Sequence, residues 1–239
     1  MSERQWARLG SITGIGFVAA MIVSVFMAPT PPHIDASTSE ILDYVTGHRT
    51  ALLGAAVVGA LAGLLFLVFL GHLRQMLQRS EGGAEALSPI VYGTGLTLVA
   101  VAFVAQLPLA ALAFAGNSPE VAGNAGLIRI LYDLNTLGMA TMMILVASFI
   151  AVTSVAMLLR EMGATALGWI GLPVAAVTAA AGVAGFYNSG YQSFWNGLNY
   201  VGLIAFAVFV LAVAVDHLIV PLAARPGPAP ARGEALPTT

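Results

Sequence analysis

Long runs of hydrophobic residues alternate with short polar segments along most of this chain. A helix rises about 1.5 Å per residue, so about 20 apolar residues are needed to cross roughly 30 Å of bilayer hydrocarbon. Six runs have about this length: 9–28, 50–70, 89–115, 134–159, 167–186 and 199–220. The alternating ten-residue segments typical of barrel strands are missing from them. The pattern therefore predicts an all-α integral membrane bundle of six transmembrane helices.

The composition of the chain supports a lipid solvent. Charged residues make up only 8% of it and hydrophobic residues 59%, whereas soluble domains carry roughly 25% charged residues. The net charge of −2 offers no basic surface for nucleic acid, so no such partner is expected. The absence of cysteine excludes disulfides, thiolate metal sites and cysteine nucleophiles. Membrane lipid is the expected surrounding partner.

The arginines predict an orientation, because cytoplasmic loops of membrane proteins carry an excess of basic residues. With the N-terminus inside, only Arg49 and Arg129 face outward. The arginines that then face the cytoplasm are Arg4, Arg8, Arg74, Arg79, Arg160, Arg225 and Arg232. We predict a multipass protein of the bacterial inner (plasma) membrane with a cytoplasmic N-terminus (1–8), a six-helix domain (9–220) and a disordered cytoplasmic tail (221–239).

The external segment between the first two spans carries a helix signal. Three prolines open it, and Ser37 with Glu40 three residues later forms the pattern of a capping box. Helical spacing then places four residues on one face. They are Ile41, Tyr44, Val45 and His48. We expect a short amphipathic external helix that lies over the bundle and ends near Gly47.

Small residues recur at helical spacing in three of the predicted spans. Membrane helices associate through small residues, so these stripes predict interior faces and are compatible with a homo-oligomer or larger membrane complex. Plain close packing is the simplest explanation of each stripe. The stripes are Ala56, Gly59 and Gly63; Arg129, Asp133, Thr136, Ala140, Ala147, Ala151 and Ser154; and Gly171, Ala175, Thr178, Gly182, Gly185 and Ser189. Met139, Met142 and Met143 are expected to fill packing gaps.

A polar cluster is predicted at the outer head of the fourth span. Arg129 and Asp133 lie four residues apart, a spacing at which helical side chains pair. The other members expected near this level are Asn135, Gln106, His48, Arg49, Tyr187 and Asn188. An ionisable group in a membrane costs roughly 2.5–3.5 kcal/mol at mid-depth and is a functional candidate by default. Three interpretations stay open: a salt bridge that fixes the helices, a ligand pocket, or an ion path.

Catalytic and cofactor motifs are lacking. His72 and His217 end the second and sixth spans on the inner side, and two such histidines are potential haem ligands. Side chains that reach the interface to cap the spans are the simpler interpretation. Neither a His-Glu-x-x-His zinc motif nor a Gly-x-Ser-x-Gly nucleophile turn occurs. We predict no catalytic residue, no metal and no cofactor.

Four short motifs carry a family resemblance. They are Ile41-x-x-Tyr44-x-x-x-His48-Arg49, Phe69-Leu70-Gly71-x-Leu73-Arg74, Leu131-Tyr132-Asp133-Leu134 and Leu167-Gly168-Trp169-Ile170-Gly171. Together they resemble actinobacterial multipass membrane proteins of the group called domain of unknown function 4386, over most of residues 9–218. The resemblance implies a six-helix bacterial membrane protein and brings no catalytic residues.

Three functional hypotheses follow from these residues. The first is a non-enzymatic membrane protein that holds a small or lipid-like ligand, or a partner helix, near the outer leaflet. Arg129 and Asp133 would fix the pocket, and Gln106, Asn135 and Tyr187 would line it. The second is a small secondary transporter with a water-filled route from this cluster to Asp216 and His217. The weakest is a membrane enzyme or haem carrier.

Overall fold

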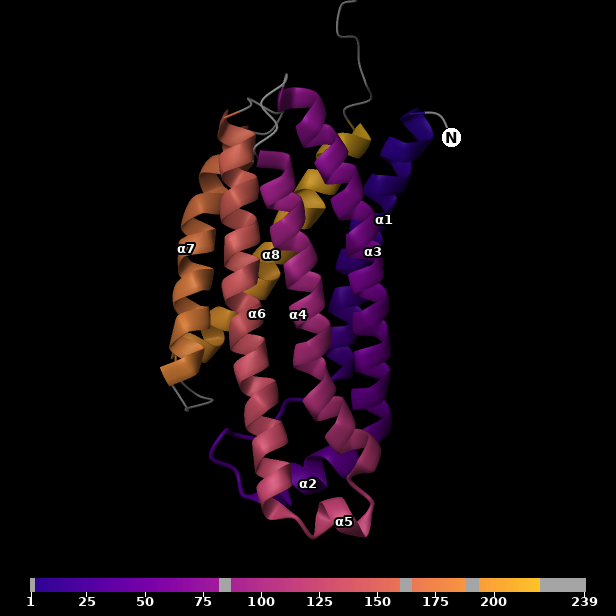
Figure 1. Ribbon diagram of the computed structural model, residues 1–239, viewed down its shortest axis with the longest axis vertical. Coiled ribbons are helices and arrows are strands. Elements are labelled where there is room, and N and C mark those ends of the chain that lie inside the picture. Colours follow the sequence, from indigo (N-terminus) through magenta and orange to yellow (C-terminus); the bar gives the residue numbers. More distant parts are fainter. Residues whose placement is uncertain (1–2, 82–86, 160–164, 188–193, 220–239) are drawn as a thin grey trace, which may run out of the picture.

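The computed structural model describes residues 3–81, 87–159, 165–187 and 194–219 and is helical apart from short connections (Figure 1). The long helices are α1 (Glu3–Met27), α3 (Arg49–Glu81), α4 (Leu87–Ala115), α6 (Ala125–Leu159), α7 (Thr165–Tyr187) and α8 (Phe194–Ile219). Two short helices are α2 (Thr38–Gly47) and α5 (Pro119–Ala122). The all-α prediction is confirmed for these ranges. The tail predicted to be disordered, 221–239, lies outside them.

Five helices, α1, α3, α4, α6 and α7, are long and apolar enough to cross a membrane. Helix α8 has 26 residues. Within its described side chains the apolar stretch is Tyr200–Val215, which is shorter than the five candidate spans. Helices α3 and α6 extend beyond the predicted spans, to Glu81 and back to Ala125. Hydropathy identifies only the lipid-solvated part of a helix. Its flanks continue as helix because leucine, glutamine, methionine and arginine favour that conformation.

The long helices form a closed ring. Each packs against the next along the chain, and α8 packs against both α7 and α1. The start of α1 and the end of α8 lie at one end of the bundle, here called the terminal end (Figure 1). Helices α2 and α5 lie at the opposite end, together with residues 29–36, here called the strap, which joins α1 to α2. We call this the strap end.

Four phenylalanine side chains meet inside the ring. The ring centroid of Phe66 lies 4.8 Å from that of Phe17, 5.4 Å from that of Phe149 and 5.8 Å from that of Phe206. Two of the three pairs, with Phe149 and Phe206, are edge-to-face, an arrangement that aromatic rings favour beyond their simple burial. All four residues are buried. They form an aromatic layer that crosses the interior of the bundle, supplied by α1, α3, α6 and α8.

Small residues set the closest approaches between helices, as the sequence stripes predicted. A Cβ added to Gly138 on α6 would lie 3.0 Å from the Cα of Ala105 on α4. A Cβ added to Gly182 on α7 would lie 3.0 Å from the backbone nitrogen of Ile144 on α6. The predicted interior face of α7 is confirmed, since Gly171, Ala175, Thr178 and Gly182 are buried. These contacts hold α4, α6 and α7 closely together.

Helix α2 begins with the predicted capping box. The Ser37 hydroxyl accepts a hydrogen bond from the Glu40 backbone N–H, and the Glu40 carboxylate accepts one from the Ser37 N–H at 2.8 Å. The Ser37 N–H and, at 3.0 Å, the Ser37 hydroxyl both donate to the Glu40 carboxylate, and these two bonds hold the pKa of Glu40 below its usual value. The predicted buried face is confirmed for Ile41, Tyr44 and Val45. It packs α2 onto the ends of α3, α4 and α6.

His48 follows Tyr44 on that face, with the two ring centroids 5.3 Å apart, but it is not buried there. His48 is exposed, and its Nδ1 lies 3.0 Å from the carbonyl oxygen of Tyr44. The buried face ends before it, because α2 ends at Gly47 and the chain leaves the helical path at His48, with φ −115° and ψ 20°.

Candidate ligand cavity

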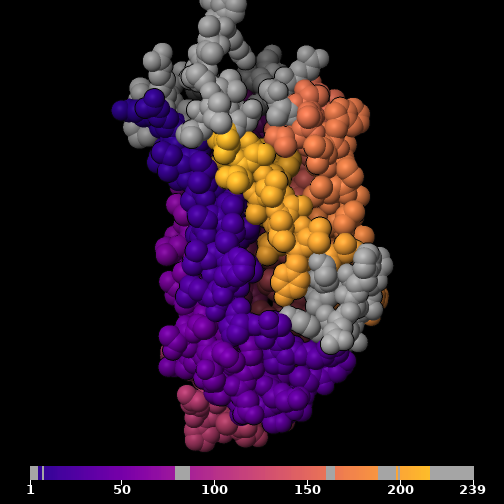
Figure 2. Space-filling view, turned by 180° about the vertical axis from the view of Figure 1, so that it is seen from behind, coloured from indigo at the N-terminus to yellow at the C-terminus, as the bar shows by residue number. Residues whose placement is uncertain are grey.

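A cavity of about 440 Å³ lies inside the ring at the strap end. Residues from all six long helices line it, and Pro29, Pro31, Pro32 and Ile34 of the strap close its outer side. Figure 2 shows the surface hollowed between α1 and α8, next to the strap. The lining side chains are mostly apolar, and the volume falls within the roughly 300–1,000 Å³ of small-molecule sites. The cavity therefore has the size and chemistry of a binding site for an apolar molecule.

The aromatic layer forms the inner floor of this central cavity. Phe17, Phe66 and Phe206 line its deepest part, and Phe149 packs directly against two of them. These four residues are between 0% and 7% exposed, so they leave little free space. Among the described residues, the floor contributes no polar side chain. The cavity is accordingly a blind pocket that is closed toward the terminal end by aromatic rings.

Small and flexible side chains form the wall. Gly59 and Gly63 of the predicted α3 stripe line the cavity, and a Cβ added to Gly63 would lie 2.5 Å from the ring of Phe103. Met139, Met142 and Met143 line it from α6, whereas the sequence interpretation treated them as packing filler. Thioether side chains adapt their shape at little cost. Together they form a wall able to fit an occupant of variable shape.

Few polar groups face this apolar wall, and most bond to helix backbones. Gln106 Nε2 donates to the carbonyl of Ala102 at 3.1 Å, and Asn135 Nδ2 donates to that of Ala105 at 2.8 Å. Gly59 makes room for the Gln106 amide, since a Cβ there would lie 2.8 Å from Oε1. Both amides line the cavity, as predicted for Gln106 and Asn135. Their remaining polar atoms are the hydrogen-bonding groups available to an occupant.

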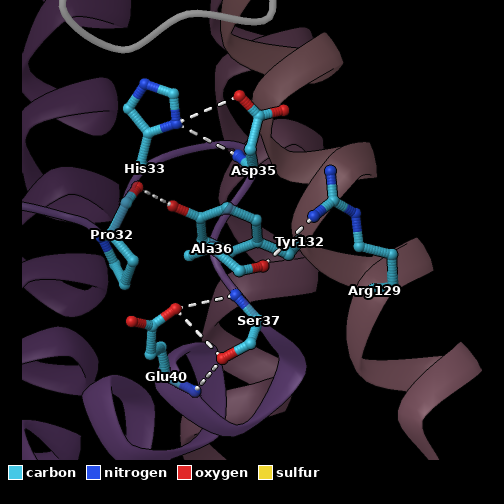
Figure 3. Close-up of polar contacts among 8 residues, drawn as sticks. All are labelled: Pro32, His33, Asp35, Ala36, Ser37, Glu40, Arg129 and Tyr132. Carbon is cyan, nitrogen blue, oxygen red and sulfur yellow. Dashed lines mark hydrogen bonds and ion pairs between the residues drawn. The ribbon is translucent and has the colours of Figure 1, made fainter.

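Two tyrosines and an arginine hold the strap over the cavity, and Figure 3 shows the contacts made by Tyr132 and Arg129. The hydroxyl of Tyr44 donates to the carbonyl of Pro29 at 2.8 Å, and that of Tyr132 donates to the carbonyl of Pro32 at 2.5 Å. Arg129 Nη1 donates to the carbonyl of Ala36 at 3.4 Å. Burial raises the pKa of Tyr44 to about 12, with Tyr132 and Tyr200 adding to the effect, so its hydroxyl stays protonated and can donate.

A second, smaller pocket lies beside the central cavity and contains the predicted ion pair. Arg129 Nε donates to Asp133 Oδ2 at 3.0 Å, as their spacing predicted. The pocket has a volume of about 280 Å³ and is called the side pocket here. Its lining residues are Ile34, Arg129, Asp133, Thr136, Leu137, Gly185, Phe186 and Tyr187. Ile34, Thr136 and Gly185 also line the central cavity, so the two spaces adjoin.

The predicted polar cluster is therefore divided. Gln106 and Asn135 line the central cavity, while Arg129, Asp133 and Tyr187 line the side pocket. His48 and Arg49 line neither. Asn188 lies outside the described residues.

Arg49 contacts the end of α4 and does not join the predicted polar cluster. Its Nε donates to the carbonyl of Ala113 at 3.1 Å, and its guanidinium lies over the ring of Phe114. The carbonyls of a last helical turn lack partners within the helix and attract cations. Arg49 thus caps the end of α4, a role that only the packing of α3 against α4 reveals.

His72 does not reach the interface as the sequence interpretation expected. It is only 5% exposed, and a Cβ added to Gly10 on α1 would overlap its imidazole. The side chain of His217 lies outside the described ones. In the part of the chain that the structure describes, no three histidine, aspartate or glutamate side chains gather as a metal site would need.

Sequence reasoning missed the strap contacts and the cavity itself. The sequence pattern places Tyr44 on the apolar face of the external helix and Tyr132 in a short family motif, and it predicts no contact for either hydroxyl. A signal was present, because a buried tyrosine hydroxyl needs a hydrogen-bond partner and the proline-rich strap offers carbonyls without helical partners. Comparison of the chain with protein-family models, with curated proteins and with solved structures finds no match.

Proposed function

We propose that this chain is a non-enzymatic, multipass protein of the bacterial inner membrane that binds one lipid-like molecule in its central cavity. The observation that carries the proposal is the cavity itself, which is apolar, of ligand size and hollowed between α1 and α8. A hydrocarbon chain enters such a site sideways from the bilayer without crossing water. The polar groups at the strap end then lie near the outer leaflet.

The membrane topology in this proposal has six spans with both termini in the cytoplasm. Helix α8 is the sixth span, since its 26 residues pack between α7 and α1 as a full member of the ring. Arg8 and Arg74 belong to helix ends at the terminal end, whereas Arg49 and Arg129 belong to the strap end. Basic residues outside the spans concentrate on the cytoplasmic side, which supports placing the terminal end inside.

The length of α6 supports the depth assigned to the ion pair. Helix α6 has 35 residues, or about 52 Å at 1.5 Å per residue, and exceeds the roughly 30 Å hydrocarbon layer. When its centre lies at mid-bilayer, Arg129 and Asp133 fall at the outer boundary of the hydrocarbon. Lipid headgroups begin at this level, and the cost of an ionisable group is smaller there.

A transport function is less well supported by the same geometry. Transport along the bundle axis needs a polar route past the aromatic layer, and that layer is tightly buried among the described residues. A haem function would need an accessible axial ligand, and His72 is enclosed against α1. A blind apolar pocket favours binding over passage.

Native mass spectrometry of the protein, extracted gently from its membrane, tests the proposal. The expected spectrum shows the 24.6 kDa chain carrying the mass of one lipid, which detergent washing removes and added lipid restores. The bare chain alone under all extraction conditions would contradict the proposal. A Soret absorption band, or the mass of a protein partner without lipid, would replace it with another function.

A further inference from the structure

The side pocket contains a carboxylate oxygen without a donor. Asp133 Oδ2 accepts the hydrogen bond from Arg129, but Asp133 Oδ1 is buried and accepts none from the described residues. A charged oxygen deprived of both water and a donor is costly. The Asp133 side chain as a whole is 40% exposed and lines the side pocket. Because Oδ1 is closed even to a water molecule, a ligand in that pocket can donate only to the exposed part of the Asp133 carboxylate.

Arg129 leaves donors for the same ligand. A guanidinium carries five N–H donors in a planar fork. The recorded hydrogen bonds use Nε, toward Asp133, and Nη1, toward the strap carbonyl of Ala36. Nη2 takes part in neither of these bonds, and its two N–H groups suit a phosphate oxygen. Because the ion pair is neutral as a whole, the side pocket suits a headgroup that is itself neutral overall but carries both charges.

The position of the side pocket ties this headgroup to the molecule in the central cavity. Ile34, Thr136 and Gly185 line both spaces, so the two pockets adjoin, and a ligand that extends past these residues would occupy both. Its apolar tail would lie between the methionines and Phe66, and its head beside Arg129 and Asp133. This step rests on the function proposed above and specifies the class of ligand.

We propose that the side pocket recognises a phosphoethanolamine headgroup, with the primary ammonium donating to the exposed part of the Asp133 carboxylate and the phosphate accepting from Arg129. A primary ammonium has three N–H donors. The trimethylated ammonium of phosphocholine has the same charge but no N–H, so it donates no hydrogen bond to the Asp133 carboxylate. A phosphoglycerol headgroup has no cation for Asp133. The distinguishing property is thus the N–H group, not the net charge.

Lipids with identical acyl chains and different headgroups test this assignment. The protein is titrated in detergent with phosphatidylethanolamine, phosphatidylcholine and phosphatidylglycerol, and bound lipid is counted by native mass spectrometry. A hydrogen bond to a charged group is worth about 1.5–3 kcal/mol, so ethanolamine is expected to bind at least about tenfold more tightly than choline. Soluble phosphoethanolamine at equal concentration is expected to leave the lipid bound, since it lacks the tail; displacement would contradict a lipid source.

Two variants test the role of each charge in the headgroup preference. Asp133→Asn removes the partner of the ammonium and leaves Arg129 in excess, so preference is expected to shift toward phosphatidylglycerol. Arg129→Gln should shift it away from phosphatidylglycerol. Arg49→Gln is the matched control, because Arg49 lies at the same end of the bundle and lines neither pocket; it should keep the wild-type order.

The outcomes separate this inference from the proposed function. Equal binding of ethanolamine and choline lipids to the wild-type protein overturns the headgroup assignment and leaves cavity binding intact. A parallel loss of all three lipids in Asp133→Asn and Arg129→Gln, with no change in their order, identifies a merely structural salt bridge and also overturns it. Failure of every lipid to bind the wild-type protein contradicts the proposed function itself.

Discussion

Replacing Ala102 with phenylalanine is expected to lower the affinity for lipid about 5- to 150-fold. Ala102 lines the central cavity from α4, and its new ring would occupy space that the tail needs. Forcing extra atoms into occupied space costs about 1–3 kcal/mol, and 1.4 kcal/mol is a tenfold change in affinity. Native mass spectrometry across a lipid titration measures the change.

The matched control for this variant is Ala111→Phe. Ala111 lies on the same helix but is exposed and does not line the cavity, so binding should be unchanged. In the lipid-free protein the Ala102→Phe ring fills empty apolar space, which tends to stabilise a fold. We therefore expect a melting temperature equal to or above that of the wild type. Equal lipid affinity in both variants would contradict the placement of the ligand.

Removing the two strap hydroxyls is expected to speed the release of lipid about thirtyfold. Tyr44→Phe and Tyr132→Phe each delete one hydrogen bond to a strap carbonyl, and such a bond contributes about 1 kcal/mol. Each loss corresponds to a roughly fivefold faster release. If the two contacts act independently, their free energies add and the two rate factors multiply. The readout is the rate at which a fluorescent lipid moves from loaded protein to vesicles.

Tyr92→Phe controls for the loss of a tyrosine hydroxyl. Tyr92 lies near the start of α4 at the terminal end, where the guanidinium of Arg74 lies over its ring. It should release lipid at the wild-type rate. Unchanged rates in the Tyr44 and Tyr132 variants would show that the strap does not control access, and that lipid passes only between α1 and α8.

Features that depend on neighbours in the chain were predictable from the sequence. The capping box of α2 and the pairing of Arg129 with Asp133 both follow from a fixed spacing along a helix. The small-residue face of α7 follows from helical periodicity alone. His48 marks the limit of this reasoning, because it lies just beyond the last helical residue.

Features that depend on how distant helices meet were not predictable. The central cavity exists because α8 closes the ring against α1 while the two leave a hollow near the strap. Depth alone assigns Gln106 and Arg49 to one cluster, yet Gln106 bonds to the carbonyl of Ala102 and lines the central cavity, whereas Arg49 bonds to the carbonyl of Ala113 and lines neither pocket. Depth along a span is readable from hydropathy, but the direction of a side chain around the ring is not.

The most direct test of the account is an experimental structure of the protein in nanodiscs containing phosphatidylethanolamine. The account predicts elongated density that runs from the aromatic layer at Phe66, past Gln106 and Thr136, to a headgroup beside Arg129 and Asp133. It also predicts that this density disappears in Ala102→Phe. Helices collapsed onto one another, or a cavity filled only by water and side chains, would contradict the claim that the cavity binds a lipid.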